Sequence, residues 1–122
     1  MSCLMTIVVI LLSFAFSWVS SIVDSEHVND GDYIEDHTSR SYLRLLFFVA
    51  LMLANPLYGL VSALIFAGTF DQFFNYNANK DSIWYLGTTA EWDKFWGVYP
   101  KAYIGMKILS ILAAGFFAYL TL

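Results

Sequence analysis

The chain has 122 residues, of which 59% are hydrophobic and 13% are charged. Soluble domains carry roughly 25% charged residues, and the mean hydropathy of +0.62 also excludes an ordinary soluble globular protein. Disorder is excluded because it requires low hydrophobicity and high net charge, whereas this chain is 19% aromatic with a formal net charge of -4. The pI of about 4.8 argues against a nucleic-acid partner, which requires a basic face.

The charged residues leave three windows of the sequence free of charge, at residues 1–23, 45–70 and 108–122. A hydrocarbon core of roughly 30 Å needs about 20 helical residues. The third window is long enough if it starts at Ala102 and Lys107 extends its ammonium toward the headgroups. We therefore predict an all-α membrane protein, a single transmembrane domain 1–122 with helices at about residues 4–23, 45–70 and 102–122.

The first window resembles a secretory signal in its apolar core and in the small residues around Ser20 and Ser21. However, no Lys or Arg precedes the core, and the apolar run exceeds the roughly 7–15 residues of a signal. We therefore expect a retained membrane anchor.

The first connection, residues 24–40, contains six acidic residues and both histidines of the chain, and we expect a solvated acidic loop. His27 and His37 lie ten residues apart without an evident scaffold, so we predict no metal site. A calcium loop around Gly31 fails because Val28 occupies a ligand position.

The second window is longer than a bilayer requires, because 26 helical residues extend about 39 Å. Asn55 and Pro56 lie inside it, and proline removes a backbone hydrogen bond and disturbs the preceding turn. We predict a packing kink at Asn55 and Pro56; a hinge or a substrate contact is the alternative.

The second connection, residues 71–101, is rich in aromatic residues. Thr88 and Glu91 fit a capping box, and aromatic residues then recur at helical spacing. We predict a short amphipathic helix at about residues 89–99, with interface anchors at Trp92, Phe95, Trp96 and Tyr99. Such a helix lies flat on the membrane or docks on another subunit, and a flat pigment or quinone is a further alternative ligand.

Small residues recur at four-residue spacing in each predicted span, where they allow helix backbones to approach closely. We predict that these residues pack the helices together: Ser13, Ser17 and Ser21 in the first span, Gly59, Ala63 and Ala67 in the second, and Ser110, Ala114 and Ala118 in the third.

Three spans would place the N-terminus and the second connection on one side and the acidic connection on the other. The second connection and Lys107 supply four lysines, whereas Arg40 and Arg44 flank the acidic connection. This bias favours the N-terminus and the aromatic connection on the cytoplasmic or matrix side.

The predicted spans contain no histidine and no acidic residue, which excludes haem ligation and a proton relay inside the bilayer. No phosphate-binding loop is evident, and no nucleophile lies beside a histidine in a span. We expect no enzymatic activity and no cofactor; bound structural lipids are the one non-protein component left open.

These observations favour a non-catalytic accessory subunit of a large membrane complex, with other subunits and membrane lipids as partners. Respiratory-chain complexes and ATP synthase of the mitochondrial inner membrane are the expected class, by analogy with their small helical subunits. The main alternative is a small homo-oligomeric transporter or channel with Asn55, Ser62 and the serines of the first span along a pore. An assembly factor is a third alternative.

Overall fold

The computed structural model describes residues 2–30, 33–80, 82–86 and 91–122, with the backbone alone at residues 2, 27–30, 33–40 and 91–93. The described residues form α-helices and no strand, so the predicted all-α class is confirmed. The helices are α1 (Ser2–Asp30), α2 (Tyr33–Ala54), α3 (Pro56–Asn77), α4 (Glu91–Val98) and α5 (Pro100–Leu120).

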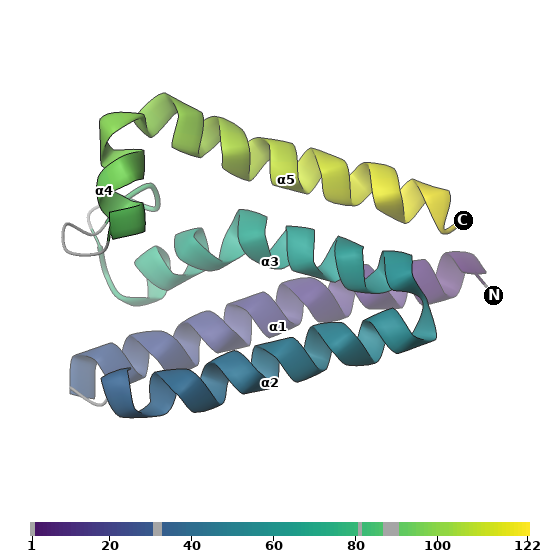
Figure 1. Cartoon of the computed structure of the whole chain (residues 1–122), viewed down its shortest axis with the longest axis horizontal. Coiled ribbons are helices and arrows are strands. Elements are labelled where there is room, and N and C mark those ends of the chain that lie inside the picture. Colours follow the sequence, from purple (N-terminus) through teal and green to yellow (C-terminus); the bar gives the residue numbers. More distant parts are fainter. Residues whose placement is uncertain (1, 31–32, 81, 87–90) are drawn as a thin grey trace.

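The four long helices run side by side, and each is antiparallel to the next long helix along the chain (Figure 1). The helix α3 lies in the middle and contacts α1, α2 and α5. The short helix α4 lies across one end of the bundle, and both termini lie at the other end (Figure 1). The outer helices therefore depend on α3 for most of their packing.

Three of these helices are long and apolar enough to cross a membrane, as the charge-free windows predict. They are Cys3–Glu26, Pro56–Asn77 and Pro100–Leu120, and a shorter apolar helix covers Ser41–Ala54. The chain is a multi-pass integral membrane protein by the length and composition of its helices.

The prediction of one kinked span over residues 45–70 is wrong, because the chain reverses direction at Asn55 and forms the two antiparallel helices α2 and α3 (Figure 1). Asn55 is extended, with φ -162° and ψ 125°, and its Oδ1 accepts from the backbone N–H of Leu57 at 3.0 Å. Pro56 follows at the first helical position, where its missing N–H costs nothing. This pair ends one helix and begins the next.

Gly59 allows α2 and α3 to approach closely just after this reversal. A Cβ atom at Gly59 would lie 1.9 Å from Cγ of Met52 and 3.1 Å from the carbonyl oxygen of Phe48. The absence of a side chain therefore sets the separation of the two helices, as small residues do at close helix contacts in membranes.

The expected solvated loop over residues 24–40 is also corrected, because the backbone is helical over residues 24–30 and 33–40. Helix α1 continues to Asp30 and α2 begins at Tyr33, so only a short connection separates them. Helix α1 thus begins in apolar sequence and ends in acidic sequence, whereas α2 begins in acidic sequence and ends in apolar sequence.

Three spans would place the two connections at opposite ends of the bundle, and the described helices do not follow that arrangement. The end of α1, the start of α2 and the helix α4 lie at the same end of the bundle (Figure 1). The reason is the reversal at Asn55, which adds one more antiparallel helix than three spans provide.

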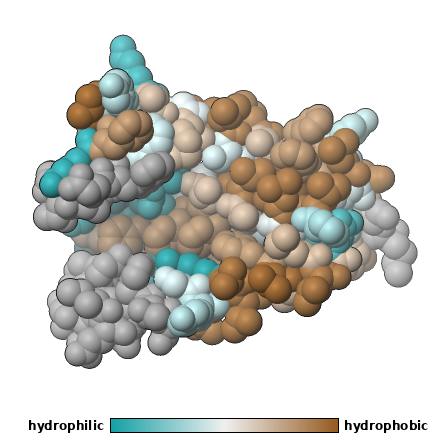
Figure 2. Space-filling model, viewed as in Figure 1, coloured by the Kyte–Doolittle hydropathy of each residue, from teal (hydrophilic) through white to brown (hydrophobic). Residues whose placement is uncertain are grey.

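Charge in the four long helices is gathered toward that same end and reaches no farther than the middle of α2. It begins at Asp24 in α1 and at Asp71 in α3, and it stops after Arg44 in α2 and Lys107 in α5. We call this the charged end, and we call the end with the termini and Asn55 the uncharged end. Hydrophobic residues cover much of the bundle between them (Figure 2).

The apolar core of the described residues lies between α3 and α5. It contains Val61, Ile65, Ala114 and Ala118, with Ile10 of α1 packed against it. Two of these are alanines, so the helices meet closely and the larger side chains project outward.

Candidate functional site: two ion pairs at the charged end

Lys107 is buried between α3 and α5, with 5% of its surface exposed. Its Nζ donates to Oδ2 of Asp71 at 2.8 Å and to the carbonyl oxygen of Ala67. The prediction that this ammonium extends toward the headgroups is therefore wrong, because the ammonium donates to acceptors on α3 instead.

Tyr103 and Gln72 join this ion pair. The Tyr103 hydroxyl donates to Oδ2 of Asp71 at 3.4 Å and accepts from Nε2 of Gln72 at 3.1 Å. The Tyr103 side chain is buried, whereas the Asp71 side chain is 49% exposed. We call Asp71, Gln72, Tyr103 and Lys107 the α3–α5 polar cluster. Its carboxylate is half-exposed, whereas its ammonium is buried.

A second ion pair joins α1 to α2. Nη2 of Arg44 donates to Oδ2 of Asp24, whose side chain is 2% exposed. The guanidinium also lies over two rings of α3, 4.6 Å from the centroid of Phe70 and 5.2 Å from that of Phe66. Cation–π contacts of this kind add attraction where water is excluded, so Arg44 ties three helices together.

Both ion pairs lie nearer to one end of the bundle than to its middle. Helix α5 extends about 20 Å from Lys107 to Leu120, and α1 extends about 33 Å from Asp24 back to Ser2. Arg44 itself lies in the middle of α2 and reaches Asp24 through its side chain. A hydrocarbon core of roughly 30 Å would therefore place both pairs toward one membrane boundary. The expectation of spans without acidic residues is corrected, since α1 contains Asp24 and α3 contains Asp71.

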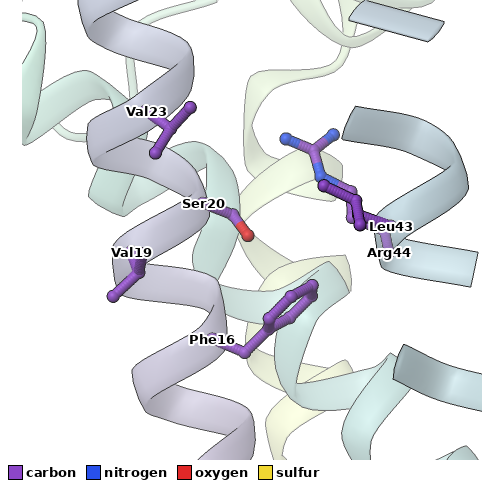
Figure 3. A pocket seen from close by; sticks show the side chains of 6 residues that line it. All are labelled: Phe16, Val19, Ser20, Val23, Leu43 and Arg44. Carbon is purple, nitrogen blue, oxygen red and sulfur yellow. The ribbon is translucent and has the colours of Figure 1, made fainter. Parts of the chain in front are cut away.

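A groove of about 180 Å³ lies beside the Arg44–Asp24 pair, between α1 and α2. Its lining residues are Phe16, Val19, Ser20, Val23, Leu43 and Arg44. Phe16 lies toward one end of the groove, and the Arg44 guanidinium lies toward the other end, at the height of Val23 (Figure 3). The walls are thus apolar, with a cationic group at the end nearer to the charged end of the bundle.

The serines predicted to pack the first span are buried. Ser13, Ser17 and Ser21 have at most 1% of their surface exposed. Ser17 shares a hydrogen bond of 2.8 Å with Thr69 of α3, and Ser21 accepts from Nδ2 of Asn77 at 2.9 Å. Hydroxyl and amide groups therefore join α1 to α3 along this seam, as is common between membrane helices.

The small residues predicted in the second span lie in different environments. Gly59 is buried, Ala63 is half-buried, and Ala67 is exposed although its carbonyl oxygen binds Lys107. Gly68, one residue later, makes the close contact with α5, since a Cβ there would lie 2.7 Å from Cδ1 of Ile111. Sequence spacing alone did not identify Gly68.

The predicted packing residues of the third span face α3 to different degrees. Ala114 and Ala118 are buried in the core against Val61 and Ile65. Ser110 is half-buried, and its Oγ donates to the carbonyl oxygen of Met106 within the same helix.

The predicted surface helix is present as α4, and Figure 1 shows it crossing the end of the bundle. Phe95 and Tyr99 are exposed, whereas Trp96 is half-buried and lies 5.9 Å from the Tyr103 ring. The side chain of Trp92 and residues 87–90 lie outside the described part of the chain. The anchors thus divide into two that face outward and one that packs toward the α3–α5 polar cluster.

Asn75 fastens the connection after α3 to this end of the bundle. Its Nδ2 donates to the carbonyl oxygens of Ile83 at 2.8 Å and Tyr85 at 2.9 Å. Trp84, between them, lies edge-on to the Tyr103 ring at 6.4 Å. A buried amide therefore holds this connection beside the polar cluster, a role that sequence analysis missed.

Among the described side chains, no group of three or more His, Cys, Asp or Glu residues could hold a metal ion. The side chains of His27 and His37 lie outside the described ones. Comparison of the chain with protein-family models, curated proteins and solved structures finds no match in any of the three.

Proposed function

We propose that the chain is a non-catalytic accessory subunit of a large multi-subunit membrane complex. Its role is to fill a position among other transmembrane helices and to present the charged end to neighbouring subunits. This function is independent of any cofactor.

The observation that carries the proposal is the outward face of α5. This helix contacts α3 along one side, while Leu109, Leu112 and Phe116 are exposed. Gly105 and Gly115 are also exposed, and a Cβ at either would meet nothing within 4 Å. Exposed glycines beside large apolar side chains suit the close approach of another transmembrane helix.

The internal use of polar groups also supports a structural role. Ser17 and Ser21 hydrogen-bond to α3, and Asn55 caps that helix. Hydroxyls that are bonded inside one bundle are poorly placed to line a pore between copies of the chain, which disfavours the homo-oligomeric transporter or channel.

We place the complex among the energy-transducing assemblies of the mitochondrial inner membrane, a respiratory-chain complex or ATP synthase. The support for this narrower proposal is an analogy of class: these complexes carry small helical subunits without catalytic residues.

Isolation of the tagged chain from its native membrane in mild detergent tests the proposal. We expect a fixed set of unrelated subunits to migrate with it on a native gel, in a mitochondrial inner-membrane fraction. A ladder of self-associated species would overturn the proposal in favour of the channel, and association with immature intermediates alone would indicate an assembly factor.

A further inference from the structure

We propose that the groove between α1 and α2 binds a phospholipid, with an acyl chain along the groove and the phosphate at Arg44. The inference is independent of whether the chain joins a larger complex. It rests on the shape of the groove, the chemistry of its two ends and its place in the bundle.

The walls of the groove match an acyl chain. Phe16, Val19 and Leu43 present apolar side chains, and Val19 and Leu43 are exposed at 56% and 62%. The groove of about 180 Å³ is open to the surroundings between α1 and α2 and has room for part of one acyl chain. A single flexible hydrocarbon chain fits such a space and is the most abundant apolar group around a membrane protein.

The cationic end of the groove matches a phosphate. Arg44 has five N–H donors in a planar fork that suits phosphate oxygens. Nη2 donates to Asp24, and 14% of the Arg44 side chain is exposed. The guanidinium therefore keeps donor capacity beyond its ion pair, while Asp24 offsets part of its charge.

The direction of the groove matches the direction of a lipid in the bilayer. Arg44 lies at the end of the groove nearer to the charged end of the bundle, and Phe16 lies toward the uncharged end (Figure 3). The Arg44 side chain extends to Asp24, which lies toward one membrane boundary, where phosphates occur, and Phe16 lies deeper. Headgroup and acyl chain are thus aligned with the complementary parts of the groove.

Photo-crosslinking of the full chain tests the proposal. The purified protein is placed in phosphatidylcholine vesicles that contain a trace of phosphatidylcholine with a diazirine in the middle of one acyl chain, and labelled residues are mapped by mass spectrometry. We expect severalfold more label on Phe16, Val19 and Leu43 than on Leu109 and Leu112, which are exposed on α5. Equal labelling of the two faces would overturn the proposal.

A variant that fills the groove gives a second test. Ser20→Trp places a large ring where the Ser20 side chain faces the groove (Figure 3), and label on the groove should fall to the level of α5. The matched control, Leu112→Trp, adds a ring on the exposed face of α5 and should leave groove labelling unchanged. Unchanged labelling in a folded Ser20→Trp variant would overturn the proposal.

The phosphate contact is tested on the unmodified chain with diacylglycerol carrying the same diazirine chain. This probe lacks the phosphate, and loss of a charge-assisted hydrogen bond should lower groove labelling by about tenfold. Equal labelling by the two probes would overturn the assignment of Arg44. Labelling by a neighbouring protein chain in the native membrane, in place of lipid, would overturn the proposal as a whole.

Discussion

Lys107 and Asp71 form an ion pair of 2.8 Å between α5 and α3, in which the two partners differ greatly in exposure. The Lys107 side chain is 6% exposed and the Asp71 side chain is 49% exposed. An unpaired buried charge costs far more than an unpaired exposed one. The pair is therefore needed mainly to compensate the ammonium.

This asymmetry predicts unequal effects of removing the two partners. Asp71→Asn leaves a buried ammonium without its carboxylate and should destabilise the bundle by about 2 kcal/mol. Lys107→Met leaves a half-exposed carboxylate and should cost about 1 kcal/mol or less. Unfolding in mixed micelles measures both values.

The double variant completes the cycle for this pair. Because Lys107→Met removes the charge that Asp71→Asn leaves uncompensated, the double variant should lose less stability than the two single variants together. Lys101→Met, at an exposed position of the same helix, is the control and should change stability little. A larger loss for Lys107→Met than for Asp71→Asn would contradict this account.

Gly59→Ala should destabilise the α2–α3 hairpin. The new Cβ would lie 1.9 Å from Cγ of Met52 and 3.1 Å from a backbone oxygen, so the helices must separate. We expect a loss of about 1–2 kcal/mol despite the better helix propensity of alanine.

Gly105→Ala is the matched control for Gly59, because a Cβ at Gly105 meets nothing within 4 Å. This substitution should leave stability unchanged or raise it by up to about 1 kcal/mol. Equal effects at the two glycines would show that the close contact with Met52 does not set the helix separation.

Asn55→Ala should cost about 1 kcal/mol, because the side chain that accepts from the N–H of Leu57 is lost. Asn55→Ser keeps a capping oxygen and should lose only a few tenths of a kcal/mol. Thermal unfolding of the two variants decides the point; if they lose the same stability, the cap does not stabilise α3.

The sequence predicted the helical class and the positions of the outer spans because charge is absent over helix-length windows. It did not predict the hairpin, because no charged residue in the 26-residue window marks where one helix ends and the next begins. Asn55 followed by Pro56 is a helix-start signal as well as a kink signal. The close approach at Gly59 favours reversal, and that contact depends on tertiary structure.

The ion pairs could not be predicted for a related reason. Lys107 and Asp71 lie 36 residues apart, and Arg44 and Asp24 lie 20 apart, so pairing depends on the relative heights of the helices. The positions of the helices along the bundle axis depend on the reversal at Asn55, and the prediction of three spans did not include that reversal. The serines of α1, in contrast, form a stripe within one helix, which sequence spacing shows directly.

The most direct test of the antiparallel bundle with one charged end is the sidedness of four single cysteines toward a membrane-impermeant maleimide. Glu26→Cys and Ser82→Cys mark the charged end, while Cys3 itself and Leu122→Cys mark the uncharged end; all four positions are exposed. The three introduced cysteines are each placed in a Cys3→Ser background. In sealed vesicles with uniform orientation, the structure predicts that the first two react from one side and the last two from the other. Reaction of Glu26→Cys and Ser82→Cys from opposite sides would contradict it and restore the three-span arrangement.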